Sequence, residues 1–505
     1  MAVYLPAVYA QLNTLGGTAI GGNGRLSLTV VGRGDKVVSP INLRSLRLAP
    51  PPTGVTPTFP GVLPVTFYYV VTAVNASGET VASNEISALI SDQTKVVQLS
   101  WDVVTGVGVT KYHVWRSTTS GTYAGGMIAE VSGELTSSYM DTGTATIAGT
   151  FPTANTALRQ PYNTFRTFTS MTTMRQTFGS ASELGVAAQV AAAMGLNTMS
   201  AISVDFSLVD AAVGDPAKLI AKEVAYQAAL DELVKHDTDL VVLLDPEPEI
   251  SLKGKAYVIS ASDIMNKSEC TLLCSGGMNS DIGDTATSGT LVYNSTQSFN
   301  HRLVSPWAPV DPYMVIIDDA GKVAEVLLNG SYVALAAAVT NALQPDEAMP
   351  ITNKSFSVFT RFATNFNRAD LQLLDPVGVS TMTTDANGVS TIVHGETSAT
   401  DTVENNELNI VVQENRLLRV VRDACKFAIG QKNSAAVRLA VHDRVAQVLQ
   451  QRVAQGLMTE WSGLEVLQDP SRPTYILVNF SHVPMYGVNV VLITIAFDTR
   501  AAVRS

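Results

Sequence analysis

Charged residues, cysteines and histidines are all scarce in this sequence of 505 residues. Only 15% of the residues are charged, against about 25% in typical soluble proteins, which favours extensive burial, including burial between subunits. The three cysteines, Cys270, Cys274 and Cys425, show no metal-ligand pattern beyond one C-x3-C spacing, so we expect reduced thiols. None of the six histidines stands at a spacing that suggests a metal site. The sequence therefore predicts neither a metal nor a cofactor.

Long apolar runs and targeting signals are missing as well. No segment approaches the roughly 20 unbroken apolar residues of a membrane-spanning helix. Residues 1–13 lack the basic and apolar regions of a signal peptide. We therefore expect a protein that folds in a cytoplasm and does not insert into a membrane. Glycine-rich stretches at 21–24 and 275–277 lack the Lys-Ser/Thr ending of a phosphate-binding loop, so they are interpreted as turns.

Two helices of strongly basic character are predicted between Asn415 and Gly456. The first has one apolar side and ends at Gly430, and the second follows the capping residues Asn433 and Ser434. Eight basic residues stand against two acidic ones between 416 and 452, although the whole chain has a net charge of −11. The basic residues singled out for a possible contact are Arg416, Arg419, Arg422, Lys426 and Lys432. They form either an ordinary solvated face or a surface for an acidic partner, and nucleic-acid binding is a competing use of such charge.

Two segments rich in β-branched residues follow the Asp469-Pro470 turn, at 474–480 and 488–497. The second segment has no obvious partner strand within its own domain. A strand in that position is available to pair with another chain.

A different kind of sequence occupies residues 46–150. Short strands separated by turn signals, including 66–75, 96–101 and 111–116, predict a β-sandwich. The segment resembles a fibronectin type III domain, in which Trp101 and Tyr112 would be core aromatic residues. We interpret it as an inserted module.

An α/β region lies between these parts. Helices are predicted at 182–195 and 216–236, and strands at 201–206 and 240–244. The buried side of the second helix is expected to carry Ile220, Val224, Ala228 and Leu233. Asp245 follows the second strand, where α/β enzymes often keep their chemistry, but no nucleophile–base pair accompanies it, so a turn-capping role is favoured. The fold class is α+β or α/β and multidomain, with mixed sheets and helices plus the inserted β-sandwich.

Short motifs in a fixed order cover most of the chain outside residues 46–150. They lie at 3–9, 25–34, 165–170, 174–179, 341–354, 374–379, 393–397, 413–416, 428–433 and 484–490. Together they resemble the contractile tail sheath proteins of bacteriophages. The family's basic residue before the glycine of the 393–397 motif is His394 here.

The sheath resemblance implies a domain order and two arms. The implied segments are an N-terminal extended arm (1–22), first core strands (23–45), the inserted sandwich (46–150), an α/β sheath domain (151–400), a C-terminal tube-facing domain (401–485) and a C-terminal strand arm (486–505). The arm residues implied to reach neighbouring subunits are Val3, Tyr4, Leu5, Val8, Tyr9, Val488, Val490, Leu492, Thr494 and Ala496. The basic face would then meet the tail tube.

The same resemblance implies a structural virion protein without catalytic residues. Its subunits would assemble in the host cytoplasm as stacked rings around the tail tube, and contraction would drive the tube through the host envelope for genome delivery. Implied partners are other copies of the chain, the tail tube protein, and the baseplate and tail terminator proteins, without direct contact to nucleic acid. Two alternatives stay open: an adhesin that uses the fibronectin-like module, and an α/β enzyme centred on Asp245.

Overall fold

The computed structural model describes residues 26–261 and 269–487, which divide into two compact units. One unit comprises the chain up to Arg33, Phe165–Arg175 and the chain from Glu183 onward, and the other comprises Gly34–Thr164 and Gln176–Ser182. The predicted arm residues, at 3–9 and 488–496, lie outside the described residues. Mixed sheets and helices in the first unit, with a separate unit built of strands, confirm the predicted fold class.

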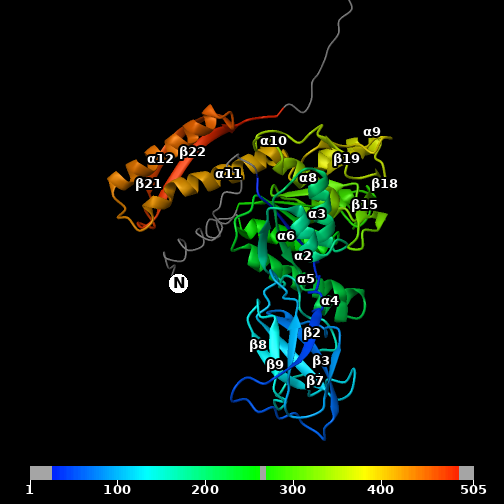
Figure 1. Cartoon of the computed structure of the whole chain (residues 1–505). Coiled ribbons are helices and arrows are strands. Elements are labelled where there is room, and N and C mark those ends of the chain that lie inside the picture. Colours follow the sequence, from blue (N-terminus) through cyan, green and yellow to red (C-terminus); the bar gives the residue numbers. More distant parts are fainter. Residues whose placement is uncertain (1–25, 262–268, 488–505) are drawn as a thin grey trace, which may run out of the picture. The chain divides into compact units, whose positions relative to one another are not determined.

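A nine-stranded sheet is the centre of the first unit (Figure 1). Its strands, in spatial order, are β10 (Phe165–Phe168), β11 (Met199–Ser203), β1 (Leu28–Gly32), β12 (Leu240–Leu243), β13 (Thr271–Ser275), β14 (Val304–Ala308), β19 (Ser380–Thr384), β20 (Ser390–His394) and β17 (Ser355–Phe356). The strands from β11 to β19 are parallel, whereas β10, β20 and β17 pair antiparallel at the margins. Every residue of β12 and β13 is buried, so helices must cover both faces there.

The principal helices of this unit are α3 (Glu183–Ala193), α5 (Asp215–Leu233), α6 (Pro248–Ala261) and α8 (Ser331–Ala342). Every residue of α8 is buried, and this helix contacts α3 as well as β12, β13 and β14. Helices α5 and α6 share a separate apolar core with the sheet, which includes Tyr226, Leu243 and Leu272.

Smaller elements complete the first unit. They are α2 (Met171–Phe178), which crosses into the second unit's sequence, α4 (Ser207–Ala211), α7 (Leu291–Tyr293), a π-helical turn η1 (Asn294–Phe299), α9 (Arg368–Leu374), a 3₁₀ turn η2 (Asp375–Val377), α10 (Val403–Asn406), and the three-stranded sheet of β16 (Val323–Leu327), β15 (Pro312–Ile317) and β18 (Arg361–Phe362).

The buried side expected for the helix at 216–236 is wrong. Ile220 and Val224 are 64% and 55% exposed, and Ala228 is exposed too. The first turns of α5 are not covered by the core, and burial begins only at Ala225, from which point the side containing Tyr226 faces inward. Of the four expected residues, only Leu233 is buried.

The C-terminal lobe, residues 408–484, contains the two predicted helices and a hairpin. It comprises α11 (Leu408–Cys425), a 3₁₀ turn η3 (Lys426–Ala428), α12 (Ala435–Ala454), β21 (Met458–Gln468) and β22 (Ile476–Pro484). Helix α11 leads away from the central sheet, and α12 and the hairpin pack along it (Figure 1). The Ser434 side chain accepts a hydrogen bond from the Val437 amide, as a helix-capping serine should. The predicted helix pair is confirmed, although the first helix begins at Leu408 and not after Asn415. The strand predicted at 474–480 is observed at Ile476–Pro484.

The second unit is a β-sandwich. One sheet has the order β2 (Leu43–Ala49), β6 (Val96–Trp101), β9 (Ser138–Asp141), and the other contains β4 (Gly78–Glu79), β3 (Val65–Asn75), β7 (Lys111–Ser117) and β8 (Met127–Ser132), with β5 (Ile86–Ile90) beside β3. Both sheets contribute to one core, in which the rings of Trp101 and Tyr112 lie 5.5 Å apart. These two residues are buried, as expected. The likeness to fibronectin type III stays a prediction.

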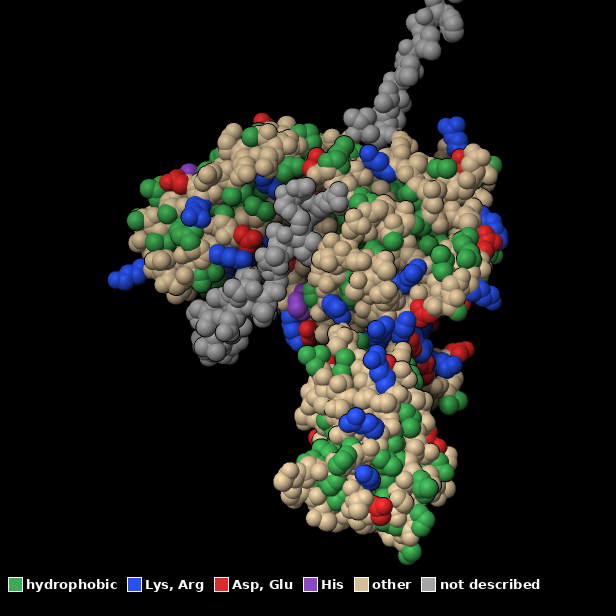
Figure 2. Space-filling model, viewed as in Figure 1, with side chains coloured by type: hydrophobic (Ala, Val, Ile, Leu, Met, Phe, Trp, Pro, Cys, Tyr) green, Lys and Arg blue, Asp and Glu red, His purple; other side chains and the backbone are tan. Residues whose placement is uncertain are grey.

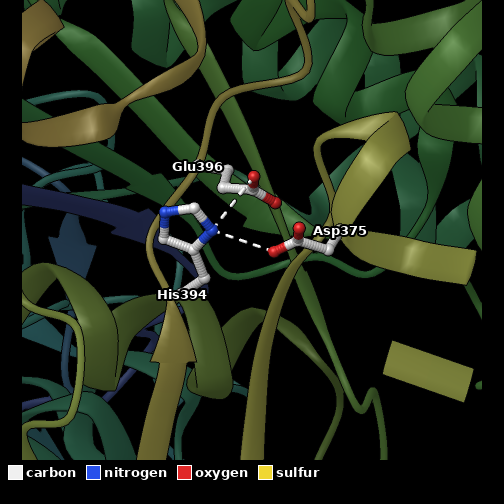
Figure 3. Close-up of side chains that lie close together, drawn as sticks. All are labelled: Asp375, His394 and Glu396. Carbon is white, nitrogen blue, oxygen red and sulfur yellow. Dashed lines mark hydrogen bonds and ion pairs between the residues drawn. The ribbon is translucent and has the colours of Figure 1, made fainter. Parts of the chain in front are cut away.

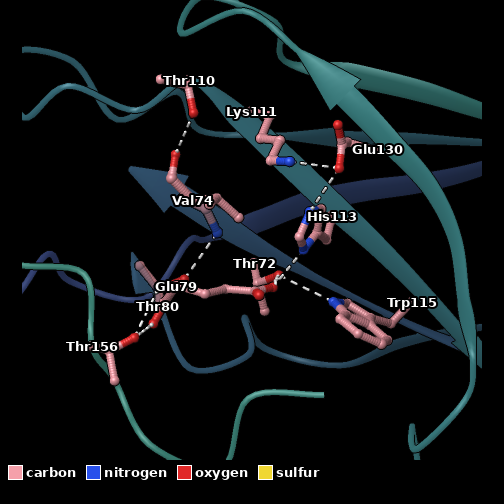
Figure 4. Close-up of polar contacts among 11 residues, drawn as sticks. Thr72, Val74, Glu79, Thr80, Thr110, Lys111, His113, Trp115, Glu130 and Thr156 are labelled. Carbon is pink, nitrogen blue, oxygen red and sulfur yellow. Dashed lines mark hydrogen bonds and ion pairs between the residues drawn. The ribbon is translucent and has the colours of Figure 1, made fainter. Parts of the chain in front are cut away.

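Charged and polar side chains on this sandwich form hydrogen bonds and ion pairs with one another. His113 lies between Glu79 and Glu130, and Lys111 pairs with Glu130 at 2.7 Å (Figure 4). Uncharged side chains and backbone make up most of the face of the molecule shown in Figure 2, in keeping with the low charged fraction. None of the helices in the described part of the chain is long and apolar enough to cross a membrane.

Candidate assembly surfaces and charged clusters

The arginines of α11 face acidic residues of their own chain. Arg419 Nη1 lies 2.7 Å from Asp239 Oδ1, and its Nη2 donates to the main-chain carbonyls of Thr238 and Glu269. Arg422 pairs with the Glu269 carboxylate, which is 2% exposed. Paired and half-buried charges of this kind hold α11 against the end of the central sheet.

The remaining predicted basic residues are placed differently. Arg416 lies 3.9 Å from Asp239, Lys426 pairs with Asp423 one helical turn away, and Lys432 is exposed in the turn between the helices. The structure thus brings Arg416, Arg419 and Arg422 together, but in a contact inside the chain. Lys426 and Lys432 are the more accessible part of the predicted face, whose contact with a tube stays a prediction.

The β21–β22 hairpin is a two-stranded sheet with one covered face. Trp461, Val466 and Phe480 pack toward the helices in the core that Val445 and Leu449 of α12 help to form. Each strand pairs only with the other among the described residues. The outer edges of both strands therefore present main-chain groups that a further strand could pair with.

Asp245 caps the turn after β12, as the favoured interpretation requires. Its Oδ1 accepts a hydrogen bond from the Glu247 amide at 3.0 Å, and its Oδ2 lies 3.0 Å from Lys222 Nζ. Burial raises the pKa of Asp245, and Lys222 opposes that rise. Nearby, Glu183 Oε2 accepts a hydrogen bond from the Arg33 amide at 2.6 Å, and burial raises the pKa of Glu183 to about 7. These contacts give Asp245 a structural role.

A shallow pocket lies next to this cluster. Its titratable lining residues are Asp281 and Asp311, and the rest of the lining is apolar or neutral, as in Pro246 and Met278. Thr364 donates a hydrogen bond to Asp311. This lining contains no histidine, cysteine, lysine or arginine.

His394 is the centre of a cluster that the histidine spacing did not reveal. Nδ1 of the ring lies 2.9 Å from Asp375 Oδ1 and 3.1 Å from Glu396 Oε1, and Nε2 lies 3.1 Å from Glu407 Oε1 (Figure 3). Burial alone would lower the pKa of His394, but the hydrogen bonds to these three carboxylates raise it to about 12. Burial raises the pKa of Glu396 to about 7. The cluster therefore favours a positive charge on or beside the ring.

Comparison with known proteins gives a likeness of fold. No family model and no curated protein sequence matches the chain. A chain in the cryo-EM structure of the anti-feeding prophage (AFP) baseplate in the contracted state matches with a TM-score of 0.52 and 16% identity, over 66% of this chain and 89% of that one. This chain has that fold.

Two other solved structures match with TM-scores below 0.5. A chain of the AFP helical sheath in the contracted state has a TM-score of 0.48 and 12% identity, over 67% of this chain and 89% of that one. The sheath tail protein from Listeria innocua has a TM-score of 0.46 and 8% identity, over 95% and 96% of the two chains. The printed descriptions of these two structures name a helical sheath and a sheath tail protein. The fold shared with the AFP baseplate chain agrees with the resemblance found in the sequence.

Proposed function

We propose that the chain is a sheath subunit of a contractile tail, which assembles as stacked rings around a tail tube. The observation that carries the proposal is the fold shared with the AFP baseplate chain over 89% of that chain's length. The ordered motifs along the sequence support it independently. Contraction of such a sheath would drive the tube through a host envelope and deliver a genome.

Strand addition is the proposed link between subunits. Among the described residues, each strand of the β21–β22 hairpin pairs on one side only, and the sequences at 3–9 and 488–496 are rich in β-branched or aromatic residues. A strand added to an edge makes main-chain hydrogen bonds that hold while the attached domains reorient. The domain divisions proposed from the sequence, with arms at 1–22 and 486–505, follow from this role.

Contraction in this proposal needs no catalytic residue. The lattice would move from a metastable extended arrangement to one with more buried surface, using energy stored during assembly. Asp245 is held in a structural ion cluster with Lys222, which agrees with a role outside catalysis. The rival enzyme hypothesis has no further support from the pocket beside Pro246.

Contacts with the tube and with the ends of the tail belong to the same proposal. Lys426 and Lys432 are the accessible basic residues that we assign to an acidic tube surface, whereas Arg416 lies near Asp239 at the α11–sheet junction. Exposed pairs of this kind contribute about 0–1 kcal/mol each and weaken with salt. In a sheath of many stacked subunits, the free energies of these weak ion pairs would add up. Baseplate and terminator proteins would contact the two ends of the sheath within a virion or a related particle.

Negative-stain electron microscopy of the untagged protein at rising concentration and salt tests the proposal. Hollow tubes or stacked rings are expected. Deleting residues 487–505 should leave a folded chain that no longer polymerises, whereas deleting only 500–505, which keeps the segment 488–497, should preserve assembly. Normal polymerisation by the longer deletion would refute strand addition by the C-terminal arm.

Monomers under every condition would call for a second experiment with an assembled tail tube as template. Binding and ordering on the tube would retain the sheath proposal. Failure on the tube as well would shift support to the adhesin hypothesis for the sandwich unit.

A further inference from the structure

The carboxylates around His394 come from three separate elements. Asp375 begins the turn η2, Glu396 follows the end of β20, and Glu407 immediately precedes the first residue of α11. Side chains of Asp375 and Glu396 both point at the same ring nitrogen, Nδ1 (Figure 3). The fold therefore places one imidazole nitrogen and two carboxylate oxygens around a single point.

We propose that Asp375, His394 and Glu396 bind one divalent transition-metal cation, of the Zn²⁺ or Mn²⁺ class. The three candidate ligand atoms all lie within 4.8 Å of one another. Donor atoms bound at about 2.0–2.2 Å in tetrahedral geometry stand roughly 3.3 Å apart. The distances of 2.9 Å and 3.1 Å from Nδ1 need to open by only a few tenths of an ångström. One imidazole with carboxylates suits Zn²⁺ and Mn²⁺ better than Mg²⁺, which prefers oxygen and water ligands.

Glu407 completes the arrangement from the other side of the ring. Its Oε1 lies 3.1 Å from Nε2, so Nε2–H can donate to it. A metal-bound histidine almost always donates its second ring N–H to a carboxylate or carbonyl, which fixes the tautomer and the ring orientation. Glu407 is therefore a positioning residue in this proposal.

A second observation points to a ligand at Glu396. The residue is only 2% exposed, and its Oε2 is buried with no hydrogen-bond partner among the described residues. A buried carboxylate oxygen without a partner costs free energy. A cation shared with Asp375 and His394 would balance that carboxylate, and the Nδ1 proton would pass to solvent when the cation binds.

The sandwich unit contains a natural comparison. His113 also lies between two carboxylates, with Nδ1 2.9 Å from Glu79 and Nε2 3.4 Å from Glu130 (Figure 4). Those two carboxylates contact different ring nitrogens, and Glu130 already forms an ion pair with Lys111. This cluster lacks the convergence on one nitrogen, so it serves as the matched control.

The test is metal binding to the full, untagged, metal-stripped chain, measured by titration calorimetry and by metal analysis after dialysis against Zn²⁺ or Mn²⁺. One ion per chain is expected, together with a raised melting temperature. His394→Lys keeps a positive charge among the carboxylates but removes the ligand nitrogen, so it should fold and lose the bound ion. Glu407→Gln should weaken binding about 10–100-fold. His113→Gln should bind as the unchanged chain does.

Two results would overturn the proposal. The first is the absence of stoichiometric binding, which would make His394 an imidazolium held by ion pairs. The second is binding that His394→Lys does not alter, which would place the ion elsewhere. Neither result depends on whether the chain forms a sheath.

Discussion

The buried carboxyl of Glu183 should make the stability of the protein fall as pH rises. Glu183 begins α3 and is surrounded by the Arg33 amide, Lys222 and Asp245. Burial raises its pKa from 4.5 to about 7 in the folded chain, although the Arg33 amide and Lys222 act in the opposite direction. Between these two values the folded state holds a proton that the unfolded state has lost.

The magnitude follows from that difference in pKa. Stability contributed by the proton is fully present below pH 4.5 and is lost as pH rises toward 7. Between pH 5 and pH 8 the loss amounts to about 2–3 kcal/mol at 1.36 kcal/mol per pKa unit. Glu183→Gln keeps an oxygen that can accept from the Arg33 amide and cannot ionise, so the variant should lack this loss.

Denaturant unfolding of wild type and Glu183→Gln at pH 5 and pH 8 measures the effect. The variant should gain about 2–3 kcal/mol relative to wild type on going from pH 5 to pH 8. Glu249→Gln, at an exposed carboxyl in the first turn of α6, is the matched control and should follow wild type. Parallel pH profiles for wild type and Glu183→Gln would refute the reasoning, because Glu183 would then titrate at its ordinary pKa.

Two further substitutions test packing and charge in the first unit. Glu347→Ala should destabilise the chain by about 3–5 kcal/mol. Arg452, which is 8% exposed and lies 2.6 Å from Glu347, would be left as a buried charge without its carboxylate. An unchanged denaturation midpoint would show that water already compensates the charge of Arg452. Gly254→Val should lower the free energy of unfolding by about 1–3 kcal/mol, because a Cβ at this position would lie 2.8 Å from a methyl group of Leu243 and 2.9 Å from one of Leu272. An unchanged free energy of unfolding in denaturant would show that α6 can move away from the sheet.

Local sequence pattern was sufficient to predict those elements whose signal lies within the segment itself. Strand β12 is a short run of aliphatic residues and α12 has an apolar stripe after a capping serine, and both signals are contained in the segments themselves. The buried side of α5 was not predictable in this way. Burial on that helix begins only at Ala225 and leaves Ile220 and Val224 exposed, and the spacing of apolar residues along the helix does not contain this information.

Charged sites were the harder part, because their partners are distant in sequence. Arg419 and Arg422 looked like a surface for a second molecule, yet Asp239 and Glu269, about 150 to 180 residues earlier, take up their charge. The cluster at His394 was not predicted for the same reason. Its partners Asp375 and Glu407 stand at spacings from His394 that match no ligand motif. A basic stripe read from sequence therefore predicts a partner without saying whether that partner is another protein or the chain itself. In this chain Arg419 and Arg422 pair with acidic residues at the end of the sheet, so among the basic residues predicted from the sequence only Lys426 and Lys432 carry the proposed tube contact without such a long-range partner.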